Sequence, residues 1–455
     1  MPASPELTTG QLVLLVGAAG AVGLALQLNN GCYDPAGLTL LVLALAAVLR
    51  AVTVPSGGTL SRLSPRAVEH LLLAVLAIQL ATLLTQPIIV TPVAGRAGWW
   101  PPRALIALGC VLIAGIAAGG PKWRHRCFVA LLLAHGAIGV WVLRHATGRD
   151  DVLLFQRSSA AALLHGQNPY AIRFPNIFAP FEGFYGKGVV VHDVLQFGFP
   201  YPPLSLLLAV PGAWLGDVRY AHVSAMTLAG AAIGYTQPGR RAFLAAALFL
   251  FSPRFGHLLC FAWTEPFVVL TLATSVLCVR RAPRLLPVAL GLFLAVKQYQ
   301  VLAIPALWLV IESRPQRSRL GSFLRLLAKS GAVALAVTLP LAIWNLREFV
   351  RSVILLQLKQ PFRPDALSFM AAWTRAGGRP SSALAFVLAA LAMLVALRTL
   401  PRTGAGFAAA IALVYLVFFS FNKQAFCNYY FLVIGACSCA VASAAIPSRP
   451  APDAR

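Results

Sequence analysis

Long runs of apolar residues recur along this sequence and constrain its fold more strongly than any other feature. Residues 12–26 and 40–49 contain no polar side chain, and residues 71–84 contain only Gln79 and Thr82. A helix needs about 20 apolar residues to cross a bilayer core of about 30 Å. The strands of a membrane barrel would instead alternate apolar and polar residues over about ten positions. The runs therefore predict an all-α polytopic membrane protein.

The composition excludes the main classes of water-soluble protein. Only 11% of the 455 residues are charged, whereas 59% are hydrophobic. A soluble domain has about a quarter of its residues charged, so this chain cannot cover its surface for water. The net charge of +24 does not indicate nucleic-acid binding, because the Lys and Arg residues lie in short clusters between the apolar runs.

The early basic clusters predict the orientation of the chain. Loops rich in Lys and Arg stay on the cytoplasmic side of a membrane, and such loops follow the second and fourth apolar segments. The N-terminus is then inside, and the polar stretch 144–203 is a large outer loop. No cleavable signal peptide is expected, because the residues before Leu12 carry no Lys or Arg. The early spans are predicted at 11–29, 37–54, 69–88, 103–119 and 126–143.

Four later basic clusters predict the rest of the topology. If all four face the cytoplasm, the chain crosses the membrane an even number of times between neighbouring clusters. Residues 242–279 then form a hairpin broken near Pro253, and residues 285–311 form a hairpin of two short helices with Lys297 near its outer tip. We expect about 12–14 spans, with both termini cytoplasmic. The clusters are Arg240/Arg241, Arg280/Arg281/Arg284, Arg314/Arg317/Arg319 and Arg398/Arg402, and the last spans are 322–344, 381–398, 405–421 and 426–445.

This topology places most acidic residues at the outer face, although carboxylates contribute little to orientation. A second outer loop, about 345–380, is an exception to the charge rule because it is rich in Lys and Arg. Either the orientation is wrong there, or these cations meet an anionic ligand. The outer acidic residues are Asp34, Asp150, Asp151, Glu182, Asp193, Glu265, Glu348 and Asp365, and the loop cations are Arg347, Arg351, Lys359, Arg363, Arg375 and Arg379.

The first outer loop carries the residues best suited to chemistry. Asp150 and Asp151 precede the stretch VLLFQRSSAAALL, whose apolar residues suit a helix that lies on the membrane surface. Gly166 and Pro169 end that helix. An aspartate in this position can cap the helix, or it can accept a proton as a general base.

Two ionisable residues also interrupt apolar runs. Lys297 is isolated within its hairpin, and intramembrane ionisable residues usually line functional cavities, although a lysine can also extend to the interface. Glu265 needs a partner, which is either Arg254 or the hydroxyl of an acceptor. The prolines after Tyr201 favour an elbow from which the chain re-enters the membrane at Leu204.

The order and spacing of several motifs resemble one known family. Asp151 is followed by an amphipathic stretch that ends in GQNPY at 166–170, and then by YPPL at 201–204, which opens a helix. The segment GLFLAVKQYQVLAIPALWLV at 291–310 and the segment NKQAFCNYY at 422–430 come later. The arrangement resembles the polyprenyl-phosphate-mannose-dependent mannosyltransferases of the GT-C superfamily (glycosyltransferase family 87), over roughly residues 150–310.

The resemblance implies a GT-C-like bundle over residues 126–455 that performs an inverting sugar transfer at the outer face of the plasma membrane. The donor would be a polyprenyl-phosphate-linked sugar, mannose in that family, and the acceptor a glycan or glycolipid. The family's base, an aspartate of the first outer loop, matches Asp151, with Asp150 as the close alternative. Residues 1–125 would form an extra transmembrane module, because five spans precede the loop here and the family usually has one.

The chemistry of such a transfer suggests roles for further side chains. Cations stabilise the lipid phosphate that departs from the donor. Lys297 is the first candidate to bind that phosphate, followed by Lys423, Arg363 and Arg254. The candidates for sugar or acceptor binding are Asp193, Glu265, Gln298, Tyr299, Asn168, Tyr170, Tyr201 and Trp263.

Several alternatives stay open at this point. A multi-span transporter or lipid-linked-sugar flippase also has many spans and broken helices, and a structural membrane scaffold would not depend on the outer carboxylates. Asp150, Asp151 and Asp193 could together hold a divalent cation through oxygen ligands, although we expect no essential metal or cofactor. The eight cysteines predict neither a zinc site nor a disulfide framework, and Cys32–Cys427 is the one bridge considered.

Overall fold

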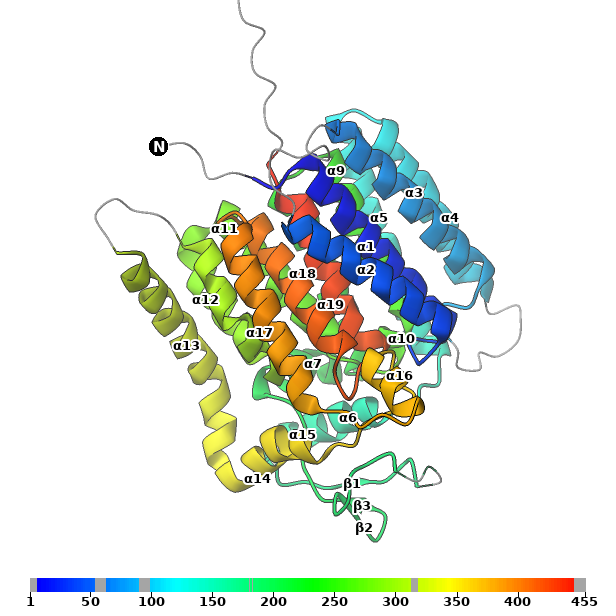
Figure 1. Ribbon diagram of the computed structural model, residues 1–455. Coiled ribbons are helices and arrows are strands. Elements are labelled where there is room, and N and C mark those ends of the chain that lie inside the picture. Colours follow the sequence, from blue (N-terminus) through cyan, green and yellow to red (C-terminus); the bar gives the residue numbers. More distant parts are fainter. Residues whose placement is uncertain are drawn as a thin grey trace, which may run out of the picture.

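The computed structural model describes residues 6–53, 63–89, 99–179, 181, 183–311 and 318–445, and it consists almost entirely of helices (Figure 1). Within this part of the chain, seven helices are long and apolar enough to cross a membrane. This is the predicted all-α, multi-span class; Glu182, Arg314 and Arg317 lie outside the described residues. The seven are α1 (Thr9–Leu28), α2 (Pro35–Thr53), α3 (Pro65–Thr85), α4 (Trp100–Ala118), α5 (Pro121–His145), α13 (Arg319–Trp344) and α17 (Ser382–Thr399).

Shorter helices form the hairpins that the basic clusters predicted. One hairpin is broken at Pro253, where Arg254 takes a left-handed backbone conformation with φ of 65°. The other turns at Lys297, between an α-helix and a 3₁₀ helix. The helices are α9 (Arg240–Leu250), α10 (Phe255–Cys260), α11 (Glu265–Arg281), α12 (Leu286–Ala295), η4 (Gln298–Val310), α18 (Gly404–Ser420) and α19 (Cys427–Ser443).

The core of the bundle lies around α18 and α19, whose side chains are almost all buried. Helices that are apolar on every side are suited to such a position. α1 packs against α19, and α2 packs against α18. The helices before residue 125 therefore join the same bundle as the C-terminal ones, and a domain boundary at 125 stays a prediction. In α13, by contrast, Ser330 and Ala342 are the buried residues, as expected for a helix that faces lipid.

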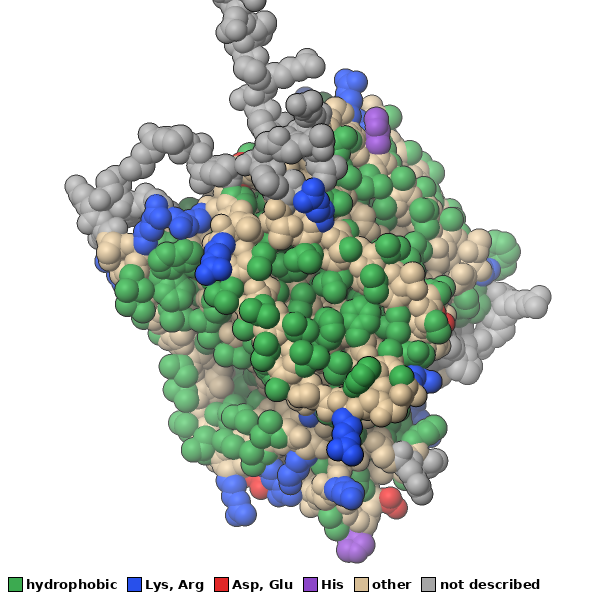
Figure 2. Space-filling view, in the orientation of Figure 1, with side chains coloured by type: hydrophobic (Ala, Val, Ile, Leu, Met, Phe, Trp, Pro, Cys, Tyr) green, Lys and Arg blue, Asp and Glu red, His purple; other side chains and the backbone are tan. Residues whose placement is uncertain are grey.

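The helices run between two chemically different faces. At one end of the bundle, Arg280 pairs with Glu6 at 3.5 Å and Arg240 pairs with Glu69 at 3.2 Å; we call this end the basic face. The opposite end, the site face, carries Asp150, Asp151 and Asp365 around one cavity. Figure 2 shows hydrophobic side chains across the middle of the molecule, with most Lys and Arg side chains toward its two ends. This separation is the arrangement expected of a bundle that spans a bilayer.

The sequence predicts that the chain crosses the bundle directly after the Pro202-Pro203 elbow. The structure shows a different path. α7 (Pro203–Trp214) is followed by a tight turn at Gly216, and Asp217 then bonds to Arg157 of the surface helix α6. α7 therefore begins and ends at the site face. The crossing is made by α8 (Arg219–Thr236), whose last residue accepts a hydrogen bond from Arg281 near the basic face.

The two polar loops pack over the site face. The first contains α6 (Asp151–Leu164) and a small antiparallel sheet in the order β1-β3-β2, and the second contains four short helical segments (Figure 1). Cys32 and Cys427 are both free thiols, so the bridge that we considered is not formed. The elements are β1 (Phe174–Pro175), β2 (Val190–Val191), β3 (Val194–Leu195), α14 (Leu346–Val350), the π-helix η5 (Arg351–Leu355), α15 (Leu356–Lys359) and α16 (Phe369–Arg375).

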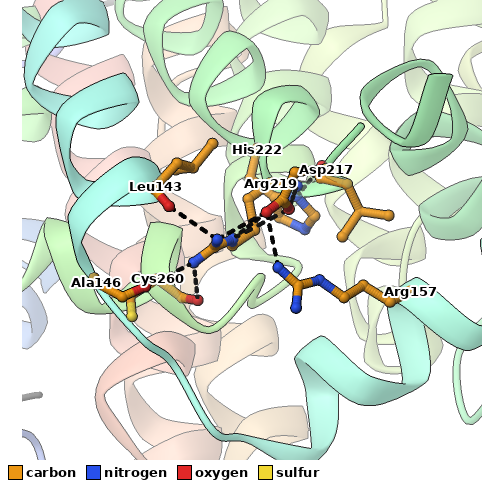
Figure 3. Close-up of polar contacts among 8 residues, drawn as sticks. Leu143, Ala146, Arg157, Asp217, Arg219, His222 and Cys260 are labelled. Atoms are coloured by element: carbon orange, nitrogen blue, oxygen red, sulfur yellow. Dashed lines mark hydrogen bonds and ion pairs between the residues drawn. The ribbon is translucent and has the colours of Figure 1, made fainter. Parts of the chain in front are cut away.

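A buried arginine fastens α6 to the bundle (Figure 3). The Arg219 guanidinium, 7% exposed, donates to Asp217 at 2.7 Å and to three backbone carbonyls at the ends of α5 and α10. Asp217 also accepts a hydrogen bond from Arg157 of α6 at 2.8 Å. Burial alone would raise the pKa of Asp217, but the hydrogen bonds from Arg219 hold it below its usual range. The carbonyls belong to Leu143, Ala146 and Cys260, at 3.0, 3.3 and 3.4 Å.

Replacing Arg219 by Met should lower the free energy of unfolding by about 3 kcal/mol, because buried carbonyls and a carboxylate lose their donor. Arg219→Lys should restore little of this loss, since an ammonium cannot reproduce the planar fork of donors. Thermal unfolding in detergent measures both variants. Arg157→Met is the control: this side chain is half exposed, so its loss should cost less than about 1 kcal/mol. Equal losses for Arg157→Met and Arg219→Met would contradict the assignment.

Candidate functional site

A cavity of about 290 Å³ opens on the site face between the two polar loops and the start of α19. Carboxylates, amides, one guanidinium and several aromatic rings line it. Its polar and aromatic lining residues include Asp150, Asp151, Tyr185, Tyr201, Trp263, Gln357, Gln360, Arg363, Phe426, Asn428 and Tyr429. Ligand sites commonly have this composition, in which apolar walls hold a few polar groups that fix orientation.

The two adjacent aspartates occupy the N-terminus of α6 and make different contacts. Asp150 is the N-cap, and its Oδ1 accepts hydrogen bonds from the Val152 amide at 2.9 Å and the Trp263 indole at 3.3 Å. Asp151 instead uses Oδ2 to accept a hydrogen bond from the Tyr185 hydroxyl at 2.8 Å. The capping role therefore belongs to Asp150, which leaves Asp151 available for chemistry in the cavity.

The environment also separates the two aspartates in acidity. Burial raises the pKa of Asp150 well above its usual range, and the neighbouring charge of Asp151 raises it further. Burial also raises the pKa of Asp151, but the hydrogen bond from Tyr185 and the positive charge of Arg363 oppose that rise. Two adjacent carboxylates do not ionise together easily, so the pair holds a proton more readily than a lone carboxyl would, and the Tyr185 hydroxyl and Arg363 favour the ionised form of Asp151. Environments that shift the pKa values of two neighbouring titratable groups by different amounts are common in active sites.

Arg363 is the one of the four proposed phosphate-binding cations that lines the cavity. Its guanidinium makes a two-pronged ion pair with Asp365, at 2.8 and 2.7 Å, and lies 4.2 Å from the ring centroid of Phe184. Burial would raise the pKa of Asp365, but these bonds hold it below its usual range. These contacts hold the Arg363 guanidinium in the wall of the cavity that Asp150 and Asp151 also line.

Lys297 forms a buried ion pair with Glu265, and Tyr299 and Asn428 also donate to the Glu265 carboxylate. The Lys297 ammonium group lies 5.0–5.4 Å from three tyrosine ring centroids, two of which, Tyr201 and Tyr429, belong to the cavity wall. Lys297 itself is not among the lining residues. The pair between Glu265 and Arg254 that we considered from the sequence is not formed, because Lys297 approaches Glu265 from the neighbouring hairpin.

The other proposed cations bind backbone carbonyls. Lys423 donates to the carbonyls of Gln357 and Gln360, at 2.7 and 2.8 Å, and so holds the second polar loop beside the cavity. Arg254 donates to the carbonyl of Pro87 at 2.8 Å and is not among the lining residues. Neither side chain is among the lining residues, and a phosphate-binding role for Lys423 or Arg254 stays a prediction.

Three of the proposed sugar-binding residues hold the elbow that carries Tyr201 instead of lining the cavity. Asn168 accepts a hydrogen bond from the Tyr170 amide at 2.8 Å, and the buried Tyr170 hydroxyl donates to the Tyr201 carbonyl at 2.9 Å. Gln298 donates to the carbonyl of Pro200 at 2.7 Å. These residues fix the position of the Tyr201 ring, so their effect on a ligand would be indirect.

Asp193 lies away from the cavity. It occupies the two-residue turn between β2 and β3, where His192 and Asp193 have φ of 48° and 59° and both side chains are exposed. The structure therefore does not bring Asp193 together with Asp150 and Asp151. Among the described residues, no cluster of three His, Cys, Asp or Glu side chains is placed to hold a metal.

Several lining residues were missed by sequence reasoning. Asn428 and Tyr429 belong to the NKQAFCNYY segment, in which only Lys423 had a predicted role. Gln357 and Gln360 lie in the second polar loop, where the sequence prediction named charged side chains and no amides. Tyr185 had no sequence signal, because it reaches Asp151 only through the path of the first loop.

No protein-family model, curated protein or solved structure matches this chain. The fold and the cavity define its class: a multi-span helical membrane protein with a polar, aromatic-lined site at one face.

Proposed function

We propose that this chain is an integral-membrane inverting glycosyltransferase. It would move a sugar, mannose by resemblance, from a polyprenyl-phosphate-linked donor to a glycan or glycolipid acceptor. The observation that carries the proposal is the position of Asp151: an acidic side chain of raised pKa, held by Tyr185, in a cavity that also contains Arg363. A cavity with a carboxylate base, a cation and aromatic walls suits a sugar phosphate better than an apolar ligand.

In the proposed reaction, Asp151 accepts the proton of an acceptor hydroxyl while the hydroxyl oxygen attacks the anomeric carbon. The bond from that carbon to the phosphate oxygen breaks, and the electron pair leaves with the lipid phosphate. Arg363 is the cation of the cavity that can stabilise this negative charge. Trp263 and Tyr201 offer aromatic faces to a pyranose ring, and Asn428 offers an amide to its hydroxyls.

The proposal also includes the orientation of the site, which rests on the distribution of basic residues. The described chain begins at the basic face with Glu6, and the Ala444 carbonyl accepts from Arg241 at that face. Since Lys- and Arg-rich loops stay cytoplasmic, the basic face and both termini would lie inside and the cavity would open outward, which in a bacterium means outside the plasma membrane. Lipid-linked sugars would then reach the cavity from the outer leaflet.

The test is an assay of the purified full-length protein in detergent with polyprenyl-phosphate mannose and a lipid extract as the acceptor source. A glycosyltransferase should release free polyprenyl phosphate and label an acceptor without any second compartment. A transporter or flippase is the second candidate, because the buried Lys297–Glu265 pair resembles the intramembrane charges of transport sites. Uptake into proteoliposomes with no release of lipid phosphate in detergent would favour that candidate and reject transfer.

A further inference from the structure

A second cavity, of about 380 Å³, lies beside the first on the site face. One wall is the helical segment α14–η5–α15, and the other is the strand region of the first polar loop. Phe197 and Leu356 line both cavities, so the two share a wall. The remaining residues that matter here are Arg347, Arg351 and Lys359, which all belong to the helical segment.

The charge of this second cavity is not balanced by the protein. Arg351 lies 3.7 Å from Glu348, but Glu348 is already paired with Arg173 at 2.7 Å. Within the described part of the chain, the side chains of Arg347 and Lys359 have neither a hydrogen-bond partner nor an ion-pair partner, and none of the described lining residues is acidic. Three cations around one cavity with one shared carboxylate leave a site for an anion.

The close fit of the walls indicates that the cavity is built into the fold. An added Cβ at Gly186 would lie 1.8 Å from the Lys359 carbonyl, so only glycine allows the first loop to approach the end of α15 so closely. The amide of Gly198 donates to the buried Ser352 hydroxyl at 2.8 Å, which fastens the same loop to η5. Both contacts hold the loop against the helix that carries the cations.

The surroundings indicate that the anion is attached to a lipid. α14–η5–α15 directly follows α13, whose end carries the half-exposed Trp344, and aromatic side chains of this kind gather at membrane interfaces. Leu346, Ile354 and Leu358 of the segment are 58%, 51% and 75% exposed. A segment with basic residues on one side and exposed apolar residues on another suits the boundary between headgroups and acyl chains.

We infer that the cavity formed by Arg347, Arg351 and Lys359 binds the phosphate of a membrane lipid. This binding explains why the second polar loop is basic although cations are disfavoured on the outer face: its side chains neutralise a ligand. The phosphate can belong to a phospholipid headgroup or to a polyprenyl phosphate. The inference does not rest on sugar transfer, although a lipid held here would lie across one wall from Asp151.

Native mass spectrometry of the full-length protein in a neutral detergent tests this inference. The probes are dioleoyl phosphatidylglycerol, undecaprenyl phosphate and, as the zwitterionic reference, dioleoyl phosphatidylcholine. The double variant R347Q/K359Q should bind at least one of the two anionic lipids about tenfold more weakly than the parent protein. The matched control is R144Q/R379Q, which removes two exposed cations of the same face that do not line the cavity.

The outcomes separate the possibilities. A loss for phosphatidylglycerol alone identifies a phospholipid headgroup, and a loss for undecaprenyl phosphate alone identifies a lipid carrier. Equal weakening in R347Q/K359Q and R144Q/R379Q, or no weakening in either, would overturn the inference, because binding would then reflect only the general charge of the face. Circular dichroism should confirm that both double variants are folded, since all four side chains are partly or fully exposed.

Discussion

Sugar transfer should fall by about 10²–10⁴-fold when Asp151 is replaced by Asn, which is the usual contribution of a general base. The Asn side chain keeps the shape of Asp and can still accept a hydrogen bond from Tyr185, so expression and thermal stability should not fall. The measurement is the rate of polyprenyl phosphate release by purified parent and variant proteins. Full activity in Asp151→Asn would remove this residue from the mechanism.

Asp150→Asn is the matched control, because it makes the same change one residue away. Asn is as good an N-cap as Asp, and the Oδ1 atom of Asp150 is engaged by the Val152 amide and the Trp263 indole, so we expect a loss of less than about tenfold. The parent enzyme should also lose activity as the pH falls through the pKa of Asp151, which burial raises above the ordinary carboxyl value. A larger loss in Asp150→Asn than in Asp151→Asn would exchange the two roles.

Replacing Glu265 by Gln should lower the free energy of unfolding by about 3–5 kcal/mol, the usual effect of leaving a buried charge without its partner. Glu265 is fully buried and the Lys297 side chain is 5% exposed, so water cannot replace the lost carboxylate. Thermal unfolding in detergent gives the comparison. Glu6→Gln is the control, because its pair with Arg280 is partly exposed at 26% and 32% and should contribute less than about 1 kcal/mol.

The double variant E265Q/K297M distinguishes the ion pair from the packing of either side chain. Removing both charges should restore most of the stability lost in Glu265→Gln, since a neutral pair of similar volume has no unpaired charge. A double variant as unstable as Glu265→Gln would show that Lys297 is held by its tyrosine contacts and not by the carboxylate.

Much of the fold could be predicted from the sequence because the bilayer imposes simple rules on each segment. The predicted spans near 322–344, 381–398 and 405–421 correspond to α13, α17 and α18 within a few residues. α7 is the exception, because its apolar composition suits a crossing, whereas the turn at Gly216 and the contacts of Asp217 with Arg157 and Arg219 place its second end at the site face as well.

The candidate site could be predicted only in part. Asp150 and Asp151 were predicted because a helix cap requires only one of two adjacent carboxylates. The structure places both in the cavity. Asp193 was grouped with them because it is acidic and lies in the same loop, but its turn points it away. Nothing local in the sequence distinguishes these cases, since the path of the loop decides which side chains meet.

The sequence by itself determined the helical class, the hairpins and the gathering of acids at one face, because hydropathy and charge act on each segment separately. The tertiary structure alone decided which charges neutralise each other. Lys297 pairs with Glu265, Arg363 pairs with Asp365 at the cavity wall, and Arg347 and Lys359 have no side-chain partner among the described residues. Such pairings join side chains from different hairpins and loops, and their energies depend on distance and burial, which no single segment contains.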